Sequence, residues 1–189
     1  MKLFWIIFIS MISFSVLAMG VEERLYTVIS KEGNVEIRDY QSVMSIEVTV
    51  VGSREKAASK AFRILVQFIK GYNETKIAIP MTAPVSQTRH SVKGWDVSFF
   101  MPATMMLSSV PIPIDKRIRV KELKQTRVAA IRFSGFGSSK NLAKYETKLR
   151  EYLKIHDYRF DESPTYAFYN APYVPPFFRR NEVLFDIMQ

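Results

Sequence analysis

The side chains that most often carry catalysis or bind metals are scarce in this chain of 189 residues. It has no cysteine and only two histidines, His90 and His156, which lack the close spacing of a paired metal site. The absence of cysteine excludes disulfides, thiol catalysis, iron–sulfur clusters and covalently attached c-type haem. Residues 135–138 (GFGS) do not fit the nucleophile elbow G-x-S-x-G, and the chain has no phosphate-binding glycine motif. We therefore predict no catalytic residue and no metal site, and a protein that is not an enzyme.

The two histidines have ordinary structural interpretations. His90 lies in the polar stretch 86–94, which we expect to be a solvent-exposed loop. His156 follows an expected helix, where a cation favours the negative end of the helix dipole. Neither position indicates a reaction.

The composition is that of a folded globular domain with many aromatic side chains. Hydrophobic residues make up 48% and charged residues 24% of the chain, which excludes a disordered protein. Aromatic residues reach 13%, and surface of this kind needs a core or a ligand to cover it. The formal net charge of +9 suits an anionic partner such as a nucleic acid, an anionic lipid or a carboxylate-bearing ligand.

Residues 1–20 have the pattern of a secretory signal peptide. Lys2 precedes an apolar run at 3–17, and small residues allow cleavage after Ala18 or Gly20. The run is shorter than the about 20 residues of a membrane span, so membrane contact is expected only if the signal stays uncleaved as an anchor. We expect an exported protein, periplasmic or secreted, with no nucleic-acid partner. The oligomeric state stays open.

The rest of the chain, 21–189, predicts one domain in which strands precede a helix. Strands are expected at 25–29, 35–40 and 43–51, where β-branched residues alternate with polar ones. Ser53 is a good N-cap for a helix whose apolar residues recur at three- and four-residue steps until Gly71.

The same order of elements recurs in the second half of the chain, with strands at 117–123 and 127–133, a loop at 135–139 and then a helix. Equivalent positions are 85 residues apart in three cases: Val43 and Val128, Ser53 and Ser138, Phe68 and Leu153. Further strands are expected at 95–101, 166–169 and 183–187. We expect an α+β fold of two similar halves, about 24–90 and 95–189, with an antiparallel sheet, two helices and a ligand groove.

Four segments together resemble the SOUL haem-binding protein family: 35–40 (VEIRDY), 76–85 (KIAIPMTAPV), 97–102 (VSFFMP) and 169–183 (YNAPYVPPFFRRNEV). The resemblance covers about residues 24–188. It implies a distorted antiparallel β-barrel with two helices, built from two similar βα halves and related to gyrase-inhibitor-like sensor domains. It also implies non-covalent binding of haem or another tetrapyrrole in an apolar groove beside the first helix.

The resemblance places the haem- or porphyrin-binding residues on the first helix and shortly after it: Ser59, Lys60, Phe62, Arg63, Val66 and Met81. Phe62 and Val66 would cover the flat apolar ring. Lys60 or Arg63 would pair with the propionates, and arginine is the better partner for a carboxylate. Phe62 also lies in the apolar stripe of the helix, so core packing is an alternative role for it.

The resemblance also places an axial histidine, found in some family members, at the position of Asp39. Aspartate is a poor ligand for haem iron compared with His, Cys, Met or Tyr. Tyr40, Met44 or Met81 could ligate instead, although methionine usually fills gaps in cores. The loss favours metal-free porphyrin or another flat apolar ligand relative to haem.

The function that follows from the resemblance is the transport, buffering or scavenging of haem or porphyrin outside the cytoplasm. Three alternatives remain open: a receptor for another hydrophobic small molecule, a hydrolase acting in the same groove, and an interaction module. Three aromatic residues in and just after the proline-rich stretch 172–176 would either cap the barrel or gate the groove: Tyr173, Phe177 and Phe178.

Overall fold

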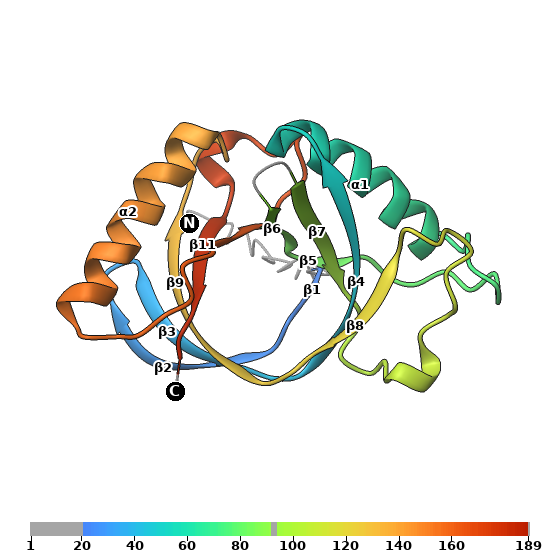
Figure 1. The fold of residues 1–189 in the computed structure, drawn as a ribbon, viewed down its shortest axis with the longest axis horizontal. Coiled ribbons are helices and arrows are strands. Elements are labelled where there is room, and N and C mark those ends of the chain that lie inside the picture. Colours follow the sequence, from blue (N-terminus) through green and yellow to red (C-terminus); the bar gives the residue numbers. More distant parts are fainter. Residues whose placement is uncertain (1–20, 92–93, 189) are drawn as a thin grey trace, which may run out of the picture.

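The computed structural model describes residues 21–91 and 94–188, which form a strongly curled antiparallel sheet with two helices on its outer face (Figure 1). The helices are α1 (Arg54–Ile69) and α2 (Ser139–Ile155). The strands are β1 (Glu22–Glu23), β2 (Tyr26–Glu32), β3 (Val35–Tyr40), β4 (Val43–Val51), β5 (Thr82–Ala83), β6 (Val85–Ser91), β7 (Gly94–Phe100), β8 (Arg119–Leu123), β9 (Thr126–Phe133), β10 (Thr165–Phe168) and β11 (Asn181–Asp186), with short 3-10 helices η1 (Leu107–Ser109) and η2 (Pro176–Phe178). The expected signal peptide and its cleavage positions lie outside the described residues.

Within the described ranges, neither helix combines the length and the apolar character that crossing a membrane requires. The main sheet has nine strands in the order β2-β3-β9-β11-β10-β6-β7-β4-β8, and all of its neighbours run antiparallel. β1 and β5 form a separate parallel pair. The expected α+β fold, a distorted antiparallel barrel with two helices, is confirmed.

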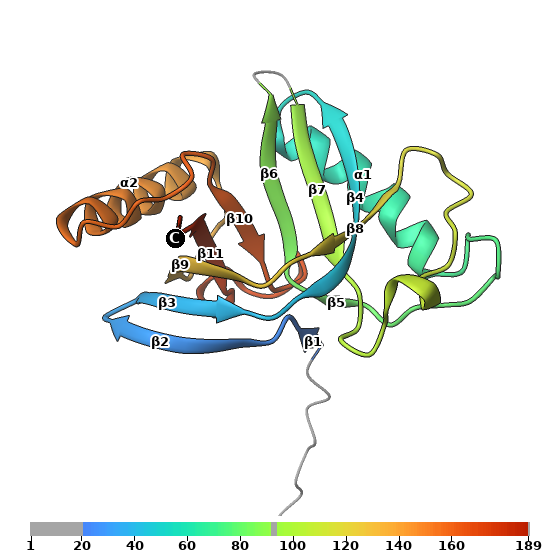
Figure 2. The same ribbon diagram turned by 60° about the horizontal axis from the view of Figure 1, so that its bottom comes forward.

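A long two-stranded ribbon, with β3 and β4 as one strand and β8 and β9 as the other, bends this sheet into a ring. Only residues 41–42 separate β3 from β4, and only residues 124–125 separate β8 from β9. Tyr40 faces Thr126 and Val43 faces Leu123, so the pairing keeps one register across both junctions. Because β4 and β9 also pair with β7 and β11, the ribbon connects the two sides of the sheet into a barrel-like ring (Figures 1 and 2).

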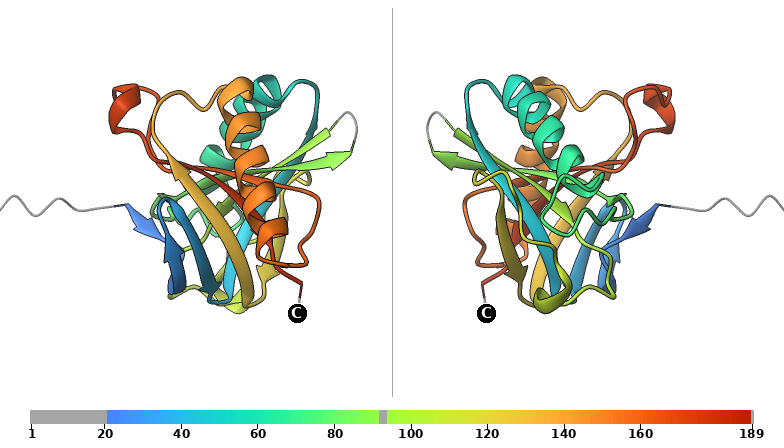
Figure 3. Two further views of the ribbon diagram at one scale, coloured as in Figure 1. Left: turned by 90° about the vertical axis from the view of Figure 1, so that its left-hand side faces the viewer. Right: turned by 90° about the vertical axis from the view of Figure 1, so that its right-hand side faces the viewer.

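Side chains along these strands alternate between the helices and the barrel interior, as the period of two requires. On β7, Val97 and Phe99 belong to the core under α1, whereas Ser98 points inward. On β11, Val183 and Phe185 belong to the core under α2, whereas Leu184 points inward. The two helices therefore bury the outer faces of the ring and leave its interior to other side chains (Figure 3).

The two helix caps give a matched test of local stability. Ser53 and Ser138 both precede their helices in extended conformation, but only the Ser138 hydroxyl accepts a hydrogen bond, from the backbone N–H of Asn141. We expect Ser138→Ala to lower the free energy of unfolding by about 1 kcal/mol. Ser53→Ala should cost less than about 0.5 kcal/mol, as for ordinary surface positions. Urea unfolding of both variants measures the difference, and equal losses would contradict this assignment of the caps.

The stretch 86–94, expected as an exposed loop, is instead largely strand β6, which pairs with both β7 and β10. The strand was not predicted because it lacks an alternating apolar pattern. Ser86 and Thr88 face the interior of the ring, where no apolar core requires hydrophobic side chains. His90 stays largely exposed on this strand, with Nδ1 2.9 Å from Oδ2 of Asp96. His156 ends α2 as expected and packs against the ring of Tyr152.

Candidate functional site

The structure brings the expected residues of the first helix together on the outer face of α1. Steps of three and four residues place these side chains on one stripe of α1: Ser59, Phe62 and Arg63 are exposed, and Val66 is half-buried against the edge of the core. Phe62 remains 40% exposed, while its ring meets the ring of Phe99 edge-on at 5.4 Å. Phe62 therefore has both roles considered for it: it covers the core and presents an apolar surface to solvent.

The cations of this face are free to meet an anion. Lys60 and Arg63 are exposed, and within residues 21–91 and 94–188 neither makes an ion pair or a hydrogen bond through its side chain. Met81 is 43% exposed on the segment before β5. Within the same residues, no hydrogen bond or ring contact links Met81 to α1, so its place in the site stays a prediction.

The position of the family's axial histidine does not adjoin this face. Asp39 lies on β3, whose neighbours in the sheet are β2 and β9, across the ring from α1 (Figure 1). Its carboxylate accepts two hydrogen bonds of 2.7 Å, from Nε and Nη2 of Arg127, which hold the pKa of Asp39 below its usual range. Asp39 and the α1 face therefore do not form one site.

The other residues considered as iron ligands are divided between core and surface. Tyr40 is buried, and its hydroxyl accepts a hydrogen bond from Arg38 at 3.0 Å. Met44 belongs to the core under α1. Met81 is the exposed member of the three, so the α1 face offers contact and charge but no assembled set of iron ligands.

Sequence reasoning missed a cavity of about 500 Å³ inside the barrel. Its wall is formed by strands on all sides of the ring and by the junction between β8 and β9. The residues that line it are Arg24, Tyr40, Glu47, Pro84, Ser86, Thr88, Ser98, Phe100, Glu122, Leu123, Lys124, Gln125, Thr126, Val128, Thr165, Ala167, Tyr169, Leu184 and Asp186. The signal that could have revealed it is the run of small polar residues at every second position of β6.

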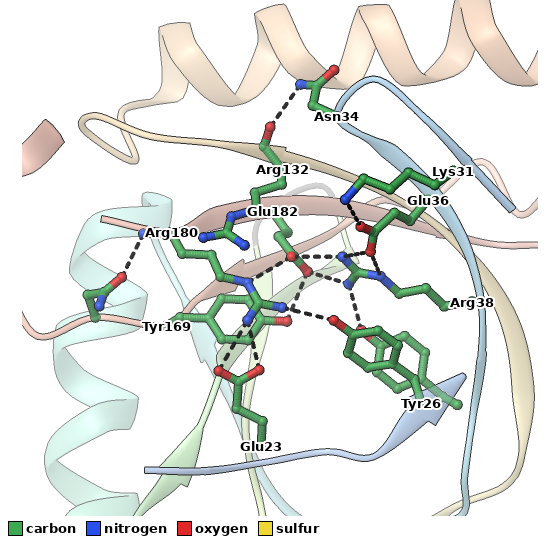
Figure 4. A network of polar contacts seen from close by, with 12 residues as sticks. Glu23, Tyr26, Lys31, Asn34, Glu36, Arg38, Arg132, Tyr169, Arg180 and Glu182 are labelled. Atoms are coloured by element: carbon green, nitrogen blue, oxygen red, sulfur yellow. Dashed lines mark hydrogen bonds and ion pairs between the residues drawn. The ribbon is translucent and has the colours of Figure 1, made fainter. Parts of the chain in front are cut away.

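A buried ion network forms part of the interior beside this cavity (Figure 4). The Glu182 carboxylate is 0% exposed and accepts hydrogen bonds from Nη1 and Nη2 of Arg38 at 2.7 and 3.0 Å. Arg180 Nε and the Tyr169 hydroxyl donate to the same carboxylate at 2.9 Å each. Burial alone would raise the pKa of Glu182, but its bonds to Arg38 and the nearby charges outweigh burial and lower that pKa.

The same ion network also contacts the first two strands, β1 and β2. Arg180 Nη1 lies 2.8 Å from Oε2 of Glu23 on β1, and the Arg38 guanidinium stacks over the ring of Tyr26 on β2 at 4.4 Å (Figure 4). All carboxylate acceptors of Glu182 have donors, which is typical of a structural ion pair rather than of a reacting group. In the part of the chain that the structure describes, no three His, Asp or Glu side chains gather as a metal site.

Comparison with known proteins adds a family and a fold. A family model described as SOUL heme-binding protein matches residues 21–186. Heme-binding protein 2 of Homo sapiens is 28% identical over 159 residues, which cover 80% of this chain and 77% of the human protein.

Among solved structures, the EcmrR C-terminal domain matches with a TM-score of 0.59 at 12% identity, covering 87% of this chain and 99% of that domain. A protein named a hydrolase, from Listeria innocua, matches with a TM-score of 0.57 at 10% identity, covering 85% of this chain and 94% of its own. At such identities the two structures show a shared fold alone.

Proposed function

Because this chain belongs to the SOUL haem-binding protein family, we propose that it binds haem or a related tetrapyrrole non-covalently on the outer face of α1. The observation that carries the proposal is the exposed Phe62 ring with the adjacent Arg63, whose guanidinium has no partner among the described residues, while Lys60 lies exposed farther round the same helix. A porphyrin has the complementary chemistry, since it combines a flat apolar ring with two carboxylates. Because Phe62 is only 40% exposed, covering the rest of its ring would contribute about 1 kcal/mol, a fraction of the about 1.5–3 kcal/mol for full burial.

The proposed binding does not depend on iron. The α1 face provides no assembled ligand set, and Asp39 is engaged with Arg127 elsewhere on the barrel. Iron would supply coordination chemistry only through a ligand such as the exposed Met81. We therefore expect metal-free porphyrin to bind about as well as haemin.

The physiological role that we propose is to carry, buffer or scavenge tetrapyrroles outside the cytoplasm. Export is supported by the signal-like pattern of residues 1–20. We propose a binding protein rather than an enzyme. The Listeria innocua protein is named a hydrolase, but it shares only the fold with this chain, so its name is no evidence for an activity here.

Titration with haemin, followed by absorbance, and with metal-free protoporphyrin, followed by tryptophan quenching, tests the proposal. Arg63→Glu should weaken both ligands by about fivefold, since an exposed ion pair contributes up to about 1 kcal/mol. The matched control is Lys148→Glu on the exposed side of α2, which makes the same change of charge outside the site.

Saturable binding of both ligands that weakens in Arg63→Glu but not in Lys148→Glu would support the α1 site. Equal losses in the two variants would show that net charge, rather than this face, attracts the ligand. If neither ligand binds, the tetrapyrrole proposal is wrong and another hydrophobic small molecule becomes the leading candidate.

A further inference from the structure

We propose that the barrel cavity is a second ligand site, for a small amphipathic zwitterion with an amino-acid-like head group and an aromatic body. The cavity lies on the inner face of the sheet, whereas α1 and its exposed residues lie outside it. The two sites are therefore separated by a wall of strands.

The space inside the barrel follows from the residues that point inward. Small barrels usually fill their interior with side chains. Here many inward positions carry small side chains instead: Ser86, Thr88, Ser98, Thr126, Thr165 and Ala167. The resulting volume of about 500 Å³ falls within the range of small-molecule sites.

The wall of this cavity contains hydroxyls that lack partners. Ser86 is only 7% exposed, and no group in the described part of the chain hydrogen-bonds to its hydroxyl. Thr126 is half-buried, and its hydroxyl likewise has no hydrogen-bond partner among the described residues, whereas Thr88 and Thr165 bond to each other at 2.9 Å. These hydroxyls line the cavity, so a polar atom on a ligand inside it can form hydrogen bonds with them.

Charges of both signs collect where the cavity meets solvent. Asp186 is exposed, lines the cavity and, among the described residues, has neither an ion pair nor a donor to its carboxylate. Arg24 lines the same cavity, and no carboxylate of residues 21–91 or 94–188 forms an ion pair with it; its guanidinium donates to the backbone carbonyls of Gln41 and Lys124. Glu122 and Lys124 are exposed beside them.

These charges favour a zwitterionic head group over a simple cation or anion. An ammonium group would pair with Asp186, and a carboxylate would lie toward Arg24, so each charge on the ligand meets its opposite. Asp186 and Arg24 both line this cavity, so one ligand can contact the two groups. Phe100, Leu184 and Val128 give the apolar walls for the body.

Calorimetric titration of the full chain with L-tryptophan, tryptamine and indole-3-propionate tests this site. L-Tryptophan carries both charges, and each analogue lacks one of them. We expect saturable one-to-one binding of L-tryptophan, and each analogue to bind about fivefold more weakly, because it loses one ion pair of up to about 1 kcal/mol. The absence of binding by L-tryptophan, or equal binding by all three molecules, would overturn the proposal.

Variants locate the site and separate it from the α1 face. Asp186→Asn should weaken L-tryptophan and tryptamine but leave indole-3-propionate unchanged, while Asp157→Asn makes the same charge change outside the cavity and should alter none of them. Ser86→Leu should narrow the cavity, replace a polar wall group by an apolar one and weaken L-tryptophan binding without changing haemin binding. If Asp186→Asn or Ser86→Leu leaves L-tryptophan binding intact, the cavity is not the site, whatever the outcome of the haemin titration.

Discussion

Replacing Glu182 with alanine should lower the free energy of unfolding by about 3–5 kcal/mol, the cost of removing one partner from a buried ion pair. Glu182 accepts from Arg38, Arg180 and Tyr169 in a place that water does not reach. Its loss leaves the Arg38 guanidinium, which is also buried, without its main counter-charge. Urea unfolding of the wild type and of Glu182→Ala measures the effect.

The control for this variant is Glu162→Ala, because Glu162 pairs with Arg150 but its side chain is 78% exposed. Exposed pairs contribute about 0–1 kcal/mol, so the control should lose little stability. A loss below about 1 kcal/mol in Glu182→Ala as well would show that the network is not a stabilising element.

The dependence of stability on pH should report the same ion pair. The pKa of Glu182 is lowered in the folded protein, so its contribution is present above the ordinary glutamate pKa of about 4.3 and is lost as the pH falls through the folded value. Below that ordinary value the stability of the wild type should therefore fall more steeply with pH than that of Glu182→Ala. Parallel curves would contradict the assignment.

Replacing Phe62 with aspartate should weaken the binding of haemin and of metal-free porphyrin by at least about tenfold. The variant removes the contact of the exposed part of the ring, about 1 kcal/mol, and places a negative charge beside the propionates, which costs up to about 1 kcal/mol more. Because the Phe62 ring is 40% exposed, the fold should survive the change despite its contact with Phe99. The two titrations described above measure the loss.

A matched control for this prediction is Ile155→Asp, which puts the same charge on an exposed apolar residue at the end of α2. Its affinities should equal those of the wild type. A tenfold loss in the control, or none in Phe62→Asp, would remove the α1 face from the proposed function, and urea midpoints for both variants would exclude unfolding as the cause.

Local patterns predicted the elements of this fold well. The bounds of β3 and β4 agree with expectation because β-branched residues and flanking turns mark them clearly. α1 was predicted from its period of apolar residues, which is the same signal that determines its buried face. β6 was missed because its inward side chains are small and polar, so hydrophobic alternation was absent.

The sites were less predictable, since they depend on contacts between distant parts of the chain. Arg38 and Glu182 are 144 residues apart, and no spacing rule connects them. The cavity likewise exists only when the strands close into a ring. The residues of the α1 face could be named in advance because one helix carries them, whereas Asp39 proved to lie elsewhere on the barrel. Export and the limits of the two halves stay predictions.

The ribbon of β3–β4 and β8–β9 makes the two halves of this protein dependent on each other. Each half would keep its helix after a cut in the connection between η1 and β8, but β3 would lose β9, and β4 would lose β8. Both fragments would then expose unpaired strand edges, which favour aggregation. The two fragments should therefore behave as a split protein: neither folds alone, and mixing the two restores the barrel.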